Sequence, residues 1–222
     1  MNEAGRMRVL LFIAWFVMGP AFAQGGGSER NRFFVQQMID LAAVNNAQGV
    51  ETMQRMLEQN PRPTAPDPAA ANASLQWGQA ALQQDNLDQA LQAFQKAIED
   101  DPGNVEAFNY LGLLYRKLDR FTDAERALQQ ALSLEPTRAV AWFQLAQVYG
   151  LQNDHRRALG ALANTYRYAQ NAMKAEEILR YIAEDEAADT LRNAALETLR
   201  LYRLPVQPVI VPPLPPNPAL FE

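Results

Sequence analysis

Few side chains in this 222-residue chain could carry out catalysis. His155 is its single histidine, and none of the three serines, Ser28, Ser74 and Ser133, lies in a G-x-S-x-G context, so a Ser-His-acid triad has little support. The chain has no cysteine, which excludes thiol chemistry and cysteine-based metal sites, and one histidine cannot form a histidine-rich zinc site. We therefore expect no enzyme, no cofactor and no bound metal.

Two acidic runs, Glu99 to Asp101 and Glu184 to Glu186, are the other candidates for acid-base or metal chemistry. Both fall near the ends of predicted helices, where carboxylates are usually just solvated. The run Gly25 to Gly27 leads into no strand-helix unit, so it does not have the context of a phosphate-binding loop. These stretches predict solvated surface rather than a catalytic site.

The segment from Met1 to Ala23 has the composition of a secretory signal. Basic residues precede an apolar run from Val9 to Met18, and the small residues Ala21 and Ala23 fit a cleavage site before Gln24. The run is shorter than the roughly 20 residues that span a bilayer, and an uncleaved membrane anchor is the alternative. We expect an exported protein, either periplasmic or secreted.

The charge balance points away from nucleic acid. The whole chain has a net charge of −5, and cleavage after Ala23 removes one acidic and two basic side chains, so the mature chain is one charge more negative. Such a balance favours solubility and opposes binding to phosphate backbones. With 48% hydrophobic residues and no cysteine, the fold must be stabilised by packing and not by disulfides.

Residues 24–60 predict a helical hairpin. Ser28 can cap a first helix that carries Phe34 and Met38 on its apolar face, and a second short helix follows. Two short helices bury too little apolar surface to be stable alone. The hairpin must therefore pack on the rest of the chain, on a second copy or on another protein. Residues 61–70 carry four prolines and predict a semi-extended linker.

After the linker, the sequence repeats itself at a constant period. Two positions of the repeat hold only small residues: Gly78, Gly112 and Ala146, then Ala90, Ala124 and Ala158. A third position holds large apolar residues: Phe94, Leu128 and Leu162. Small residues let the two helices of one unit approach closely, and large residues fill the space to the next unit. The pattern predicts stacked helix pairs that share one core.

This pattern resembles the tetratricopeptide repeat family, whose units are about 34 residues long. The middle unit carries its signature most fully: Phe108, Leu111, Gly112, Tyr115, Ala124, Leu128, Ala131 and Pro136. The third unit keeps the first part but has Thr165 and Gln170 at the last two positions. The resemblance implies an all-α, right-handed solenoid with units at residues 71–104, 105–138 and 139–172, the third degenerate at its end.

Two further segments follow the repeats. Residues 173–204 keep a helical period without the signature and predict a degenerate helix pair that caps the solenoid. Residues 205–222 contain seven of the fourteen prolines, which favours polyproline II over regular helix. This tail is either a disordered end or an apolar docking segment.

In the resembled family, the first helix of each unit lines a concave groove. Transferred position by position, the groove residues are Asn72, Gln76, Gln79, Asn109, Tyr110, Leu113, Arg116, Phe143, Gln144 and Gln147. Side-chain amides can pair with the N–H and C=O groups of an extended peptide, although amides also populate ordinary solvated helix faces. The clamp by which some members hold a terminal carboxylate is absent, because other residues occupy its positions: Leu75, Gln79, Tyr110, Val140 and Gln144.

Together these features predict an exported, non-catalytic adaptor or assembly factor that binds a peptide or helix of another protein in its groove. The alternative is a structural envelope protein that forms homo-oligomers through residues 28–60. In a third arrangement, residues 208–214 fold back onto Tyr110 and Phe143 and make the protein self-inhibited.

Overall fold

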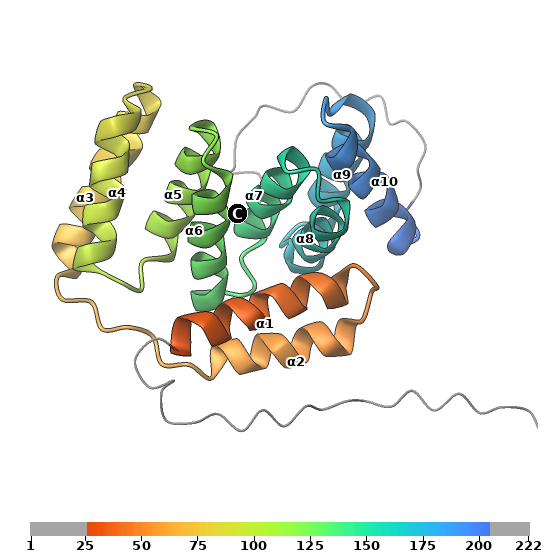
Figure 1. Cartoon of the computed structure of the whole chain (residues 1–222), viewed down its shortest axis with the longest axis horizontal. Helices are drawn as coiled ribbons and strands as arrows, with labels where there is room; N and C mark the ends of the chain where they lie inside the picture. The colour runs from red at the N-terminus through yellow and green to blue at the C-terminus, as the bar shows by residue number, and fades with distance from the viewer. Residues whose placement is uncertain (1–25, 205–222) are drawn as a thin grey trace, which may run out of the picture.

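The computed structural model describes residues 26–204, and all regular structure in that range is helical. Its ten helices are α1 (Gly26–Ala42), α2 (Ala47–Glu58), α3 (Pro68–Gln83), α4 (Leu87–Asp100), α5 (Val105–Lys117), α6 (Phe121–Leu134), α7 (Ala139–Leu151), α8 (His155–Tyr168), α9 (Ala172–Asp185) and α10 (Asp189–Leu201) (Figure 1). None of these helices is long and apolar enough to cross a bilayer. The all-α prediction is confirmed, whereas the predicted signal and the proline-rich tail lie outside the described residues.

Four of the helix pairs share one type of turn, in which a residue adopts the left-handed backbone region with φ between 53° and 59°: Asn45, Asp85, Asp119 and Asn153. Asn and Asp tolerate this region better than most residues with a side chain. The last three positions follow one another at the period of the sequence, so the sequence period is also the period of the backbone. In three of these turns, the next residue caps the following helix by accepting a backbone N–H: Asn46, Asn86 and Asp154.

The pairs α3–α4, α5–α6 and α7–α8 form the three repeat units. Within a unit the helices are closest at the small residues: a Cβ placed on Gly78 would lie 2.5 Å from the Phe94 ring, and one on Gly112 would lie 2.5 Å from Leu128. Between units, apolar residues share a core, as Leu111 of α5 packs in one cluster with Phe94 of α4. The units therefore stack side by side in chain order (Figure 1).

The first repeat helix begins earlier than the sequence suggested. Residues 68–70, expected in the linker, form the first turn of α3. Proline is favoured at the first position of a helix, because the N–H that it lacks would have no helical partner there. Asp67 caps this turn, since its carboxylate accepts the N–H of Ala70 at 2.9 Å.

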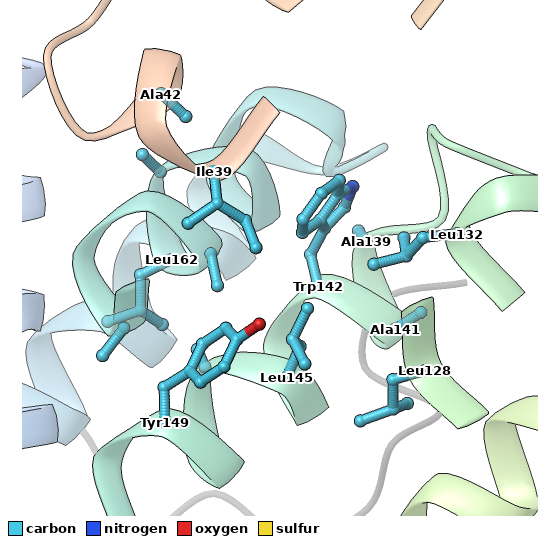
Figure 2. Close-up of a cluster of buried hydrophobic side chains, with 14 of the residues drawn as sticks. Ile39, Ala42, Leu128, Leu132, Ala139, Ala141, Trp142, Leu145, Tyr149 and Leu162 are labelled. Atoms are coloured by element: carbon cyan, nitrogen blue, oxygen red, sulfur yellow. The ribbon is translucent and has the colours of Figure 1, made fainter. Parts of the chain in front are cut away.

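The α1–α2 hairpin packs on the chain itself, against α6 and α8, and runs across the repeat helices (Figure 1). Met38 and Ile39 of α1 are fully buried. Ile39 lies with Trp142 of α7 and Leu162 of α8 in the cluster that Figure 2 shows. The backbones are in close contact, because a Cβ on Gly160 of α8 would lie 2.1 Å from the carbonyl oxygen of Ile39.

This docking covers most of the surface that the oligomer hypothesis would use. Met38 is buried and Phe34 is half-buried against the same core, whereas Phe33 remains 57% exposed. The apolar face of the hairpin thus has its partner within the same chain.

The last pair, α9–α10, covers the C-terminal end of the stack. It is α10, the second helix, that packs on α7 and α8, while α9 packs mainly on α10. A Cβ on Gly150 of α7 would lie 2.8 Å from the Cβ of Leu191 of α10. Tyr202, just after α10, donates its hydroxyl to the carbonyl oxygen of Ala163 at 3.1 Å.

Candidate protein-binding face

The ten predicted groove residues lie on α3, α5 and α7, the first helix of each repeat unit. Spacings of three and four residues keep the members of each helix on one side of it, as in Asn109, Leu113 and Arg116 of α5. Because α5 contacts both α3 and α7, the three sets are neighbours. We call these ten residues the inner face.

The inner face is exposed at its α3 end and buried farther along. Asn72 and Gln76 of α3 are exposed, whereas Asn109 of α5 and Gln144 of α7 are 5% and 3% exposed. The remaining members are half-buried: Gln79, Tyr110, Leu113, Arg116, Phe143 and Gln147. Only the α3 part therefore resembles an ordinary solvated helix surface.

Three buried polar atoms of the inner face lack a hydrogen-bond partner within the described part of the chain: Asn109 Oδ1, Gln144 Oε1 and Arg116 Nε. A buried group without a partner costs about 1–3 kcal/mol. Two are acceptors and one is a donor, so they match the N–H and C=O groups of a peptide backbone. Within residues 26–204, the inner face thus has unsatisfied hydrogen-bonding groups on α5 and α7.

Aromatic and charged groups flank these amides. The Tyr110 ring stacks on Phe94, with centroids 5.2 Å apart and planes inclined by 10°. Burial lowers the pKa of the Arg116 guanidinium below its ordinary value, and the Glu186 carboxylate partly offsets this. Arginine nevertheless stays protonated at neutral pH because its ordinary pKa lies far above 7. The face therefore combines neutral amides with one cation.

A separate hollow of about 620 Å³ lies where the start of α1 meets α5 and α6. None of the ten inner-face residues lines it. Its charged lining includes Asp123 and Arg126, which form an ion pair at 3.5 Å, and the Arg126 side chain is mostly exposed. Such a solvated ion pair contributes little to stability, and the hollow lies apart from the inner face.

The residues with catalytic potential serve local structure. His155 is the first residue of α8, and its Nε2 lies 3.2 Å from Oε2 of Glu197 on α10. In the first acidic run, Asp100 pairs with Lys96 at 2.8 Å, and Asp101 accepts the N–H of Gly103 at 2.9 Å. Within residues 26–204, no three His, Cys, Asp or Glu side chains gather in a way that could hold a metal ion.

A polar cluster that the repeat pattern did not indicate joins α6, α7 and α8. Tyr149 donates its hydroxyl to Glu125 Oε1 at 3.1 Å, and Arg157 Nη1 donates to the same oxygen at 2.9 Å. The Arg157 guanidinium also lies over the Tyr149 ring, 4.4 Å from its centroid. Burial raises the pKa of Tyr149 well above its usual range. The signal was present, since Glu125 and Arg157 are separated by almost one repeat period and thus lie at nearly the same level of successive units.

Comparisons with known proteins agree with the repeat architecture. Sequence models described as tetratricopeptide repeat match residues 41–105, 75–134 and 127–160. Together these matches extend over residues 41–160, which is more than half of the chain.

Similar proteins share the repeats but are much longer. The chain is 29% identical over 99 residues to the cilia- and flagella-associated protein 70 of Homo sapiens. This aligned region is 45% of this chain and 9% of that protein. It is 35% identical over 63 residues to the peroxisomal targeting signal receptor of Kluyveromyces lactis, covering 28% of this chain and 11% of that one. The chain thus spans about a tenth of the length of these curated relatives.

Solved structures with similar arrangements include MamA, with a TM-score of 0.49, 21% identity, and coverage of 69% of this chain and 85% of that chain. A mutant O-GlcNAc transferase of Thermobaculum terrenum has a TM-score of 0.49 and 23% identity over 70% of this chain and 30% of that one. The repeat matches, the regular backbone period and the stacked helix pairs together show that the chain belongs to the tetratricopeptide repeat family, whose repeats serve interaction with other proteins.

Proposed function

We propose that this protein is an exported, non-catalytic adaptor or assembly factor, and that it binds an extended segment of another protein on its inner face. The observation that carries the proposal is a pair of buried amide acceptors, Asn109 Oδ1 and Gln144 Oε1, that have no hydrogen-bond partner within residues 26–204. The proposal of export rests on the composition of residues 1–23.

An extended peptide fits these acceptors better than a helix does. The backbone N–H groups of a helix are already bonded within it, apart from those of its first turn. The N–H groups of an extended segment are free to donate, so they can satisfy Asn109 and Gln144 when these two buried side chains turn toward the surface. Leu113 and Phe143, half-buried beside these amides, supply apolar surface for side chains of the segment.

The charge of the inner face narrows the chemistry of the partner. Its ten residues include one charged side chain, Arg116. A largely uncharged segment avoids leaving a charge unpaired at the buried amides, and one carboxylate can pair with Arg116. One relative is, by its name, a receptor for a targeting signal, which agrees with recognition of a short segment.

The test replaces the two acceptors by an apolar residue of similar size. The double variant Asn109→Leu, Gln144→Leu removes the unpaired amides, so its thermal stability should equal or exceed that of the parent. A phage-displayed library of random peptides should select binders for the parent that bind the double variant at least about tenfold more weakly, the effect of losing about 1.4 kcal/mol.

A matched control makes the same amide-to-leucine change away from the inner face. Gln92→Leu alters an exposed amide on α4, away from the inner face, and should leave binding of the selected peptides unchanged. If the double variant binds them as tightly as the parent, the inner face is not the binding site. For either outcome, the parent and the double variant can be crosslinked to their partners in a native envelope fraction, which would identify the natural ligand.

A further inference from the structure

The N-terminal end of the repeat stack is an apolar surface that no helix of the described chain covers. Within the described residues, α3 packs mainly on α4 and also contacts α5. Trp77 of α3 is 58% exposed, and Ala73 and Ala80, one turn to either side of it, are exposed too. We call Ala73, Trp77 and Ala80 the end face.

The later repeat units show what this surface is built for. The equivalent positions, one and two periods farther along the chain, are buried in both later units: Ala107, Leu111 and Leu114 of α5, then Ala141, Leu145 and Val148 of α7. In each case the preceding unit covers them, as Leu111 and Leu114 pack with Phe94 of α4. Figure 2 shows Ala141 and Leu145 facing Leu128 and Leu132 of α6. The end face is therefore a stacking surface without its neighbour.

The composition of α3 differs from that of a terminal cap. Repeat arrays usually end in units with a polar outer face, which keeps them soluble. Pro68–Gln83 contains no charged residue, and the end face consists of one tryptophan between two alanines. Small residues beside a large one allow another helix to approach closely. The surface is suited to a helix that is also apolar and uncharged.

The opposite end of the stack is charged, although Met173 and Tyr181 of α9 are exposed there as well. The exposed side chains of α9–α10 include six charged ones: Lys174, Glu184, Asp185, Asp189, Glu197 and Arg200. Stacking this end on α3 would remove charges from water, and α3 has no charge to pair with them. Head-to-tail association is thus unfavourable, whereas a second α3 brings a matching neutral surface.

We propose that the end face binds a second copy of this chain, α3 against α3, in a closed two-fold dimer. In such an interface the same patch serves both subunits, so Trp77 of each copy packs among Ala73 and Ala80 of the other. A helix of 16 residues is about 24 Å long and about 10 Å wide, so α3 against α3 buries on the order of 500 Å² in total. That area is small for a specific complex, so the dimer is weak and its formation depends on protein concentration.

The dimer leaves the inner face open. Each inner-face residue of α3 directly precedes an end-face residue, as Gln76 precedes Trp77, so the two faces are about 100° apart around α3. The end face and the inner face therefore occupy different sides of the same helix, and the dimer presents two inner faces at once. The inference does not depend on the function proposed above, because it uses none of the inner-face residues.

The test measures mass against concentration by sedimentation equilibrium, with the chain from Gln24 onward. We expect the mass to rise to twice that of one chain and then stay constant. Trp77→Glu should remain a folded monomer at every concentration, because the side chain is exposed and its replacement removes the apolar contact. Far-ultraviolet circular dichroism checks the fold of the variant.

Two controls place the same change elsewhere. Met173→Glu alters the most exposed apolar residue described on α9, and Phe33→Glu alters the exposed residue of the hairpin; both should dimerise like the parent. A parent that stays monomeric, a Trp77→Glu variant that still dimerises, or dimers lost through Phe33→Glu would overturn the proposal. Mass that grows without limit and is stopped by Met173→Glu would show head-to-tail stacking instead.

A second readout reports the symmetry directly. The chain has no cysteine, so single substitutions Ala73→Cys and Ala80→Cys each give one thiol per subunit. A short bismaleimide crosslinker should join two copies through at least one of these positions, and not through Gln92→Cys on the exposed side of α4. Crosslinking through Gln92 alone would contradict the α3 interface.

Discussion

The two helix pairs outside the repeats, α1–α2 and α9–α10, both pack against α8, but they differ in their turns and in their positions relative to the stack. The α1–α2 pair has the turn of the repeats, with Asn45 in the left-handed region, yet it lies across α6 and α8. The α9–α10 pair has no such turn, yet α10 continues the stack on α7 and α8. The type of turn therefore does not determine where a helix pair packs. The shape of the surface that the pair packs with does.

Side-chain size explains why α1–α2 leaves the stack. Aligning its turn with that of the first unit places Met38 and Val50 where that unit has Gly78 and Ala90. Large residues at these two positions keep the helices farther apart than in a repeat unit. The pair therefore has a different shape, and it buries Met38 and Val50 in the common core instead.

The contact of α1 with α8 should be the most sensitive to substitution. Gly160→Ala would place a Cβ 2.1 Å from the carbonyl oxygen of Ile39, so α1 must move away. We expect a loss of about 3 kcal/mol or more in unfolding free energy, since backbone on both sides prevents repacking. Denaturant unfolding measures the loss, and hydrogen exchange should rise first in α1 and α2. Gly27→Ala, with nothing within 4 Å, should cost nothing.

The matching change at the other pair is Gly150→Ala. Its Cβ would lie 2.8 Å from the Cβ of Leu191, a side-chain atom that can yield slightly when α10 shifts. We expect a loss of about 1–3 kcal/mol in the same denaturant experiment, with faster hydrogen exchange in α9 and α10 only. A loss as large as that of Gly160→Ala would mean that the two contacts are equally rigid.

The two pairs also differ in the hydrogen bonds that fix them to α8. Asn164 Nδ2 donates to the carbonyl oxygen of Met38 at 3.2 Å in the core. Asn164 is fully buried, so Asn164→Ala removes this hydrogen bond and leaves a small cavity, which should cost about 1–3 kcal/mol. The corresponding anchor of α10 is the half-buried Tyr202 hydroxyl, and Tyr202→Phe should cost only about 0.5–1.5 kcal/mol. Thermal unfolding of both variants checks the order, and the reverse order would contradict it.

A change of similar size affects both pairs, because it acts on α8 itself. Asp154 caps α8 by accepting the N–H of Arg157 at 3.0 Å. Asp154→Ala should cost about 1 kcal/mol at neutral pH, measured by thermal unfolding, and should raise hydrogen exchange in α1 and α10 alike. An effect on one pair only would show that α8 does not couple them.

The pH dependence of this cap has a definite sign. Burial raises the pKa of the Asp154 carboxyl, but hydrogen bonds from the backbone N–H and guanidinium of Arg157 lower it by more, so it lies below its usual range. A lowered folded-state pKa means that the charge adds stability above the unfolded pKa of about 3.9, and that this is lost as pH falls through the folded value. The gap between parent and Asp154→Ala should therefore narrow only in acid.

The repeat units and the register of the inner face could be predicted because they depend on local spacing. The burial of Asn109 and Gln144 could not, since it is set by neighbouring helices rather than by their own. The docking of α1 had an unused signal. The outer positions of the second helices change along the array, from Gln92 and Lys96 in α4 to Gly160 and Asn164 in α8. Loss of long polar side chains there indicates a covered helix face.

The docking of α1 on α8 also sets an order of assembly during synthesis. The hydrogen bond from Asn164 to Met38 joins residues 126 positions apart, whereas each repeat pair closes within a single period. Closing a long loop is slower and costs more entropy than closing a short one. As the chain grows from its N-terminus, the hairpin is made first, but its apolar face has no partner until α8 exists. The segment synthesised first is therefore among the last to reach its final contacts, and it exposes Met38 and Ile39 during that wait.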